Sequence, residues 1–122
     1  MLVEDLRVYQ KLFELAFGIH HLTLTFPKFE LYELGSQLRR SSNSAPANLA
    51  EGFDNKHTNI YLECISRSKG EILETRHHLK MAHRKEYLSA EHLKTILKEY
   101  DDCLKMLYGL EKSLLTRSRS RR

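Results

Sequence analysis

The stretch RRSSNSAPANLAEG, from Arg39 to Gly52, decides the fold, because long amphipathic helical patterns lie on both sides of it. Within it the side chains become small or polar, and Pro46 stands where helical spacing would otherwise continue. Apolar positions before and inside the stretch still recur at helical intervals of four and seven: Leu34, Leu38, Ala45 and Leu49. This spacing predicts one helix that passes through the proline with a bend.

The same stretch carries a set of positions that we expect to be structural. Pro46 cannot donate a hydrogen bond to the carbonyl of Ser42, so that carbonyl needs another partner. Asn48 and Glu51 are expected to satisfy backbone groups or to hold a neighbouring helix. Gly52 is expected to end the helix in the left-handed conformation, which glycine adopts cheaply. The predicted structural set is Ser44, Pro46, Asn48, Glu51 and Gly52.

Four long helical patterns follow one another along the chain. They span residues 5–25, 30–51, 58–85 and 89–115. Asp5 and Ser89 are predicted to cap the first and the fourth helix, since both can accept a hydrogen bond from a free backbone N–H. Strand-like alternation and internal repeats are absent from the sequence. The pattern therefore predicts an all-α, up-down-up-down four-helix bundle.

The first helix has two apolar faces instead of one. Its main stripe is Val8, Leu12, Leu15, Ile19, Leu22 and Phe26. A second stripe lies nearly opposite: Leu6, Phe13, Phe17 and Leu24. A small bundle covers one face of a helix, so we predict that a neighbouring subunit covers the second stripe. The alternative is a helix buried on all sides within one chain.

The third helix sorts its charges by sign. Its predicted core stripe is Tyr61, Ile65, Ser68, Ile72, Thr75, Leu79 and Ala82. One flank is basic, with Lys69, Arg76, Lys80 and Arg84. The other flank is largely acidic, with Glu63, Arg67, Glu71, Glu74 and His78.

Composition limits the class of protein. A chain of 122 residues with 41% hydrophobic and 30% charged residues indicates one globular domain with a modest core. No apolar run is long enough to cross a membrane, and the amino terminus has no apolar signal core, so we expect a cytoplasmic protein. Cys64 and Cys103 fall on core positions, where buried thiols are favoured over a disulfide or a metal ligand.

All of the net positive charge comes from the carboxyl terminus. The sequence has 20 basic and 16 acidic residues, and four of the basic ones are Arg117, Arg119, Arg121 and Arg122. Residues 1–116 are therefore neutral. Beyond Thr116 nothing apolar remains to be buried, so we expect a bundle over 1–115 followed by a disordered basic tail over 116–122.

Catalytic and metal-binding patterns are weak. Glu74 and His77 form one Glu-x-x-His motif, whereas di-iron bundles need two such motifs and two further glutamates. Glu71 could pair with Glu74 as a general acid and base. The favoured alternative is that both bind Arg39, Arg40 or the exposed groups around Asn48. We therefore expect no enzyme activity, no metal and no cofactor. The adjacent histidine pairs are expected at a surface or an interface: His20 with His21, and His77 with His78.

Basic residues give the stronger functional indication. Phosphate binding needs several cations at suitable spacing and no single fixed geometry. The predicted nucleic-acid-binding set is Arg39, Arg40, Lys69, Arg76, Lys80, Arg84, Lys85, Arg117, Arg119, Arg121 and Arg122. A ring of copies would repeat each patch and so strengthen a weak contact.

Several motifs together resemble a known family. They are DLRVYQ, FPKFELYEL, QLRR, SAPANLAEG, Ser68 with Glu71, and ETRHHLKMA, in that order along the chain. They resemble the bacterial four-helix-bundle proteins often encoded in intervening sequences of large-subunit ribosomal RNA genes. That family is related to the accessory variability determinants of diversity-generating retroelements. The chain departs from it at SRSKGE, where many members have a Gly-Ser pair.

The resemblance implies a pentameric barrel that binds structured RNA or DNA and, in the retroelement branch, docks to a reverse transcriptase. Our first hypothesis is accordingly a ring-forming, non-enzymatic nucleic-acid-binding scaffold, most concretely a retroelement accessory subunit. The alternatives are a ribosomal-RNA intervening-sequence protein and a protein-interaction module that binds no nucleic acid. A metal-dependent bundle enzyme is the remotest hypothesis.

Overall fold

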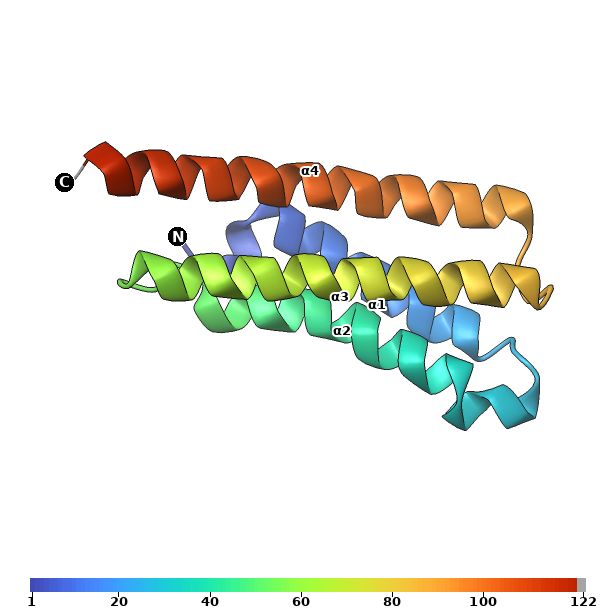
Figure 1. Ribbon diagram of the computed structural model, residues 1–122. Coiled ribbons are helices and arrows are strands. Elements are labelled where there is room, and N and C mark those ends of the chain that lie inside the picture. Colours follow the sequence, from blue (N-terminus) through green and yellow to red (C-terminus); the bar gives the residue numbers. More distant parts are fainter. Residues whose placement is uncertain (121–122) are drawn as a thin grey trace.

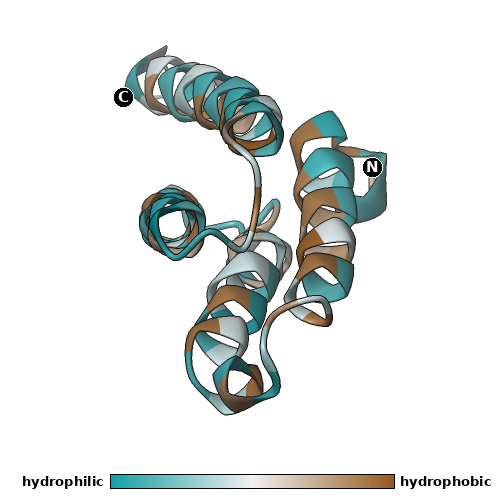
Figure 2. Cartoon of the chain, turned by 90° about the vertical axis from the view of Figure 1, so that its right-hand side faces the viewer, coloured by the Kyte–Doolittle hydropathy of each residue, from teal (hydrophilic) through white to brown (hydrophobic). Residues whose placement is uncertain are grey.

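The computed structural model describes residues 1–120, which form two short 3-10 helices and four α-helices. In chain order these are η1 Val3–Asp5, α1 Arg7–Thr23, η2 Lys28–Tyr32, α2 Leu34–Gly52, α3 Thr58–Arg84 and α4 Ala90–Ser120. Successive α-helices run in opposite directions (Figure 1), and seen end-on they surround a common interior (Figure 2). Residues 1–120 contain no strand. The predicted all-α class with four helices is confirmed.

The first two helices begin later than the sequence pattern predicts. Leu6, and not Asp5, is the N-cap of α1, so the predicted cap was wrong. The Asp5 carboxylate instead accepts a hydrogen bond from the Leu2 N–H at 2.9 Å, since η1 precedes the helix. The second helix begins at Leu34 because η2 occupies the residues directly after Pro27, whose fixed φ favours a new helical turn.

The fourth helix begins as predicted and ends later. The Ser89 hydroxyl accepts a hydrogen bond from the His92 N–H at 3.0 Å, which confirms the predicted cap. The predicted end near Leu115 was wrong, because α4 continues to Ser120. Arginine has a high helix propensity, so the helix can run on without apolar residues to bury. The stretch predicted as a disordered tail is thus helical over residues 116–120, and residues 121 and 122 lie outside the described residues.

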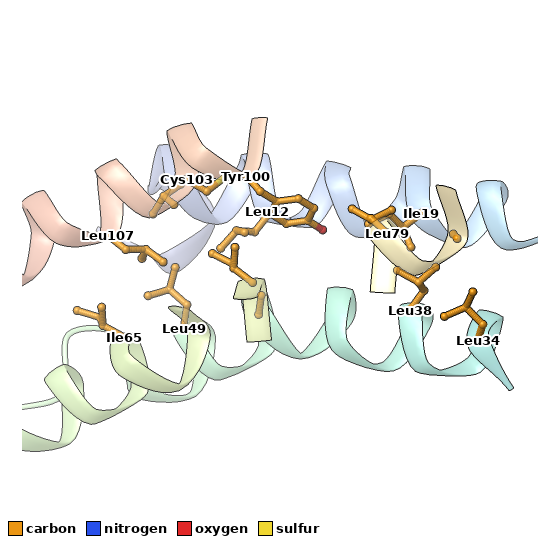
Figure 3. Close-up of a cluster of buried hydrophobic side chains, with 14 of the residues drawn as sticks. Leu12, Ile19, Leu34, Leu38, Leu49, Ile65, Leu79, Tyr100, Cys103 and Leu107 are labelled. Atoms are coloured by element: carbon orange, nitrogen blue, oxygen red, sulfur yellow. The ribbon is translucent and has the colours of Figure 1, made fainter. Parts of the chain in front are cut away.

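The core lies between the four α-helices (Figure 3). Every member of the core stripe predicted for the third helix is buried, from Tyr61 to Ala82. Tyr100 reaches inward from α4 toward Leu12 of α1, and both side chains are fully buried. Cys64 and Cys103 are buried free thiols, as predicted. Burial raises the pKa of the Cys103 thiol to about 11, so it stays protonated at neutral pH.

The α2–α3 seam, the most extensive contact between two helices, is lined by small residues of the deciding stretch. Helix α2 continues through Pro46, as predicted. The Ser68 hydroxyl of α3 donates to the Ala45 carbonyl at 2.8 Å. Two turns further along α3, the Thr75 hydroxyl donates to the Ser41 hydroxyl at 2.7 Å. The buried hydroxyls of α3 thus find their partners on α2, close to the proline.

Of the predicted structural residues, Asn48 has the expected role, whereas Glu51 and Gly52 do not. The Asn48 amide donates to the Ser44 carbonyl at 2.8 Å, which satisfies a backbone group. Glu51 is exposed. Gly52 ends α2, but the described glycines have no positive φ, so the predicted left-handed conformation was wrong. A Cβ atom at Gly52 would lie 2.4 Å from the Cys64 Sγ, which gives the physical reason for glycine here.

Candidate functional site

The basic flank of α3, which comprises Lys69, Arg76, Lys80 and Arg84, lies partly against α4. Lys69 Nζ is 2.6 Å from Glu111 Oε1 and 4.3 Å from the centre of the Tyr108 ring. Arg76 Nη1 is 3.2 Å from Asp101 Oδ1. Both cations are mostly shielded from water, so their charges hold α3 to α4. A phosphate could reach them only in competition with these carboxylates.

The two arginines of the deciding stretch also have partners within the chain. Arg39 donates to the Thr23 hydroxyl at 2.9 Å and to the Leu31 carbonyl at 2.5 Å. Arg40 binds Glu71 at 3.1 Å and forms a second ion pair with Glu74. The prediction that both glutamates bind an arginine is therefore confirmed.

The Arg40 ion pairs also fix the charge state of Glu74. Burial alone would raise the pKa of Glu74, but the hydrogen bond from Arg40 and the contact with His78 at 3.3 Å lower it below its usual value. Glu74 is therefore a carboxylate at neutral pH and has no proton to give as a general acid.

Lys85 takes part in a buried cluster that the sequence reasoning missed. The Glu30 carboxylate is fully buried and accepts hydrogen bonds from Lys85 Nζ at 2.8 Å and from the Tyr87 hydroxyl at 2.7 Å. These two bonds lower the pKa of Glu30 in spite of its burial. The signal in the sequence was an acidic residue between Phe29 and Leu31, where a solvated carboxylate would be unexpected.

The remaining predicted cations lie at opposite ends of the bundle. Lys80 and Arg84 are exposed near the end of α3, whereas Arg117 and Arg119 are exposed near the end of α4. Because α3 and α4 are antiparallel, these pairs are separated by the length of the bundle (Figure 1). Arg121 and Arg122 lie outside the described residues. These four exposed cations therefore form two separate groups, one at each end of the bundle.

The α1 outer face, which we define as Phe13, Phe17 and Leu24, is open within the chain. Phe13 is 54% exposed, Phe17 58% and Leu24 57%, whereas Leu6 is half-buried against the core. A groove of about 530 Å³ between α1 and α2 borders this face. Its walls are Phe13, Ala16, Phe17 and His20 from α1, and Ser36, Arg39, Arg40, Asn43 and Pro46 from α2. Three large apolar side chains in water on one helix form a surface typical of an interface.

The histidines and acids do not come together as metal ligands within residues 1–120. No group of three His, Cys, Asp or Glu residues there is arranged to hold a metal ion. His78 contacts Glu74, while His77 is exposed and lies against His78 with 5.3 Å between the ring centres. No helix in the same part of the chain is both long and apolar enough to pass through a membrane.

Comparison with known proteins decides the family. The model of the family described as "23S rRNA-intervening sequence protein" matches residues 4–109. The chain belongs to this family. The matched family is the ribosomal-RNA intervening-sequence family. A protein of that family was the alternative to our first hypothesis, a retroelement accessory subunit. The match contains nothing on retroelements, so docking to a reverse transcriptase stays a prediction.

A solved structure supports the fold of this intervening-sequence family member. It is the crystal structure of a protein with unknown function from the S23 ribosomal protein family of Bacteroides thetaiotaomicron. The two chains are 24% identical and superpose with a TM-score of 0.80, over 89% of this chain and 98% of the other. At this identity the likeness establishes the fold alone. Comparison with curated proteins found none that matches.

Proposed function

We propose that the protein is a non-enzymatic, homo-oligomeric scaffold that binds structured RNA. The observation that carries the proposal is the basic end of α4. Residues 1–116 are neutral, and the charge of +4 resides in four arginines that follow Thr116. Of these, Arg117 and Arg119 are exposed on the last turns of α4, and no acidic residue follows Glu111. Such an end attracts a phosphate backbone.

The choice of RNA as the polyanion follows the resemblance to the family, which implies binding to structured RNA or DNA. The α1 outer face supports assembly, since copies of the chain could cover it for one another. Assembly would gather several basic ends in one particle, and several weak contacts made together give tight binding. We propose a ring of five copies, as the resemblance to the family implies.

The test measures RNA affinity as a function of salt for the full chain and for a chain that ends at Thr116. For structured RNA we expect a steep loss of affinity with rising salt, because bound phosphates release counterions. Removing the arginines should reduce the slope of log affinity against log salt by roughly 0.7 to 0.9 for each phosphate that is no longer bound. Failure of both chains to bind, or binding by the full chain that ignores salt, would reject the proposal.

A matched control separates the position of the charges from their number. The variant Arg117→Gln/Arg119→Gln/Arg121→Gln removes three charges from the carboxyl-terminal end. The control Lys80→Gln/Lys94→Gln/Lys98→Gln removes three exposed charges from the opposite end of the bundle, near the end of α3 and the start of α4. We expect the first variant to weaken binding and the second to leave it nearly unchanged. Equal effects would mean that net charge alone drives binding.

A further inference from the structure

The groove between α1 and α2 has apolar and basic walls and no acidic wall. Phe13 and Phe17 of α1 supply apolar surface. Arg39 and Arg40 of α2 and His20 of α1 supply basic groups. None of the nine residues that line the groove is Asp or Glu. An occupant that matches these walls has apolar side chains together with negative charge.

The charge of Arg39 has no counter-charge within the described chain. Its two hydrogen bonds go to neutral oxygen atoms, the Thr23 hydroxyl and the Leu31 carbonyl, and no carboxylate of residues 1–120 forms an ion pair with it. Arg40, by contrast, has two glutamate partners on α3. Because Arg39 is half-buried, solvent ions screen its charge less than that of a fully exposed arginine. A carboxylate in the groove would supply the missing counter-charge.

The amino-terminal segment, which we define as residues 1–5, combines apolar surface with negative charge. Met1 is 80% exposed and Leu2 is 68% exposed, and the segment carries the exposed side chains of Glu4 and Asp5. Neither Met1 nor Leu2 has a Lys, Arg or His within four residues in the sequence. Every other large apolar side chain that is exposed in residues 1–120 has at least one. The charge of the groove therefore selects this segment among the exposed apolar surfaces of the described chain.

Hydrogen bonds hold the amino-terminal segment in one conformation. The Asp5 carboxylate accepts from the Leu2 N–H at 2.9 Å, and the Gln10 side chain donates to the Glu4 carbonyl at 2.7 Å. The Glu4 carboxylate itself has no hydrogen bond or ion pair within residues 1–120. A turn that is already formed loses less conformational freedom on binding than a flexible end. The segment thus has a fixed shape and a carboxylate that is free to pair.

We propose that the amino-terminal segment of one copy of this chain binds in the α1–α2 groove of a second copy. The apolar side chains of the segment pack against Phe13 and Phe17, and Glu4 lies beside Arg39. The groove, at about 530 Å³, falls within the range of about 300–1,000 Å³ for sites that enclose compact ligands. Two different surfaces meet in this contact, so further copies can add until a ring closes. The inference rests on the assembly proposed above and names the surfaces that make it.

Two variants that each lose one surface give the direct test. Leu2→Ser/Glu4→Lys alters the segment and keeps the groove, whereas Ala16→Glu/Asn43→Glu fills the groove with acidic side chains and keeps the segment. In native mass spectrometry each variant alone should be a single chain. An equal mixture should give a two-chain complex and nothing larger, because each pair has one intact segment and one intact groove. Assembly of either variant alone to the size of the wild type would overturn the inference.

A matched control makes the same chemical change at another place. Ile60→Ser/Glu63→Lys replaces an exposed apolar side chain and an exposed glutamate on α3. This control should assemble like the wild type. If it loses assembly to the same extent as Leu2→Ser/Glu4→Lys, the position of the segment does not matter and the inference is wrong.

Thiol-specific cross-linking identifies the surfaces that meet without removing either of them. Cys64 and Cys103 are buried, so they react little. Leu2→Cys and Asn43→Cys chains, produced together, should cross-link into a two-chain product that neither gives alone. Ile60→Cys with Asn43→Cys should give none. Cross-linking of Leu2→Cys chains to one another would show that segment meets segment and would overturn the inference.

The outcomes separate this inference from the proposed function. A wild-type protein that stays a single chain rejects the inference and the proposed assembly together. A wild type that assembles, with Leu2→Ser/Glu4→Lys assembling equally well, rejects the inference and leaves the proposed function standing. Protection of the Asn43→Cys thiol by structured RNA, and not by a second copy, would assign the groove to nucleic acid and reject the inference.

Discussion

At the α2–α3 seam the chain places glycine, serine and threonine, whereas on the α1 outer face it places phenylalanine and leucine. The seam brings two backbones together, and its hydroxyls bind across the contact, as Ser68 does to the Ala45 carbonyl. The outer face has large side chains, and more than half of the surface of each is exposed in the described chain. Side chains are thus small where two helices of the chain meet and large on the face of α1 that the described chain leaves open.

The substitution with the largest expected effect adds one methyl group to the seam. Gly52→Ala would place a Cβ atom 2.4 Å from both the Cβ and the Sγ of Cys64, so the two helices must separate. We expect the free energy of unfolding to fall by about 3 kcal/mol, at the upper end for overpacking. Denaturant unfolding monitored by circular dichroism measures this.

The matched control lies in α1, beside the outer face. Nothing in the described chain lies within 4 Å of a Cβ atom at Gly18. Gly18→Ala should therefore stabilise the helix by roughly 0.5–1 kcal/mol, because alanine restricts the unfolded chain. If both alanine variants lose stability equally, the contrast between the two regions is wrong.

The stability that Glu30 contributes, in η2 between α1 and α2, should depend on pH. Glu30 is buried, and its pKa is lowered below its ordinary value of 4.5 by Lys85 and Tyr87. Its contribution to stability is therefore fully present above pH 4.5 and lost as pH falls through the lower folded value. At neutral pH we expect Glu30→Gln to cost about 1.5–3 kcal/mol, as for hydrogen bonds to a charged group.

Urea unfolding of wild type and Glu30→Gln at a series of pH values from neutral to acid tests this sign. The stability difference between the two proteins should shrink toward acid, because protonation of Glu30 removes the same charge. A difference that stays constant with pH would show that Glu30 acts through shape alone.

Loss of a single hydroxyl from the seam should have a smaller effect. Ser68→Ala removes the donor to the Ala45 carbonyl, which precedes Pro46 and lies in a buried position. We expect a loss of about 1–2 kcal/mol, since the carbonyl stays buried without that partner. Ser66→Ala, at an exposed position of the same helix, is the control and should change stability by less than about 0.5 kcal/mol. Thermal unfolding of the two variants gives the comparison.

The substitution with the smallest expected effect should leave the stability of the protein unchanged or raise it. The hydroxyls of Ser68 and Thr75 have partners at the seam, but the buried Tyr100 hydroxyl has none among the described residues. Burial also raises the pKa of Tyr100, so the group stays neutral. Tyr100→Phe should leave stability unchanged or raise it by up to about 1 kcal/mol. A clear loss of stability in calorimetry would indicate that the hydroxyl has a partner after all.

Features that lie within a single helix could be predicted from the sequence. The spacing from Tyr61 to Ala82 identified the buried face of α3, and the spacing from Phe13 to Leu24 identified the open face of α1. Ser89 could be recognised as a cap because its partner lies three residues away. These relations depend on the helical period alone, which the sequence displays directly.

Features that depend on the register between helices could not be found this way. Lys69 meets Glu111 and Arg76 meets Asp101 only because α3 and α4 lie antiparallel at one particular offset. From helical spacing alone, Lys69 and Arg76 were predicted to bind phosphate. The spacing does not show that carboxylates of α4 lie beside them. Glu30 was missed because η2 follows a period of three, so its buried side differs from that of an α-helix.

The size of the particle in solution tests the central claim that other copies cover the α1 outer face. Native mass spectrometry of the full chain should give a closed assembly of 14.4 kDa subunits, five by our proposal. Phe13→Ser/Phe17→Ser should reduce it to single folded chains, while Ile60→Ser/Leu73→Ser, at exposed positions of α3, should leave it intact. A wild-type protein that remains a single 14.4 kDa chain at high micromolar concentration would contradict the account.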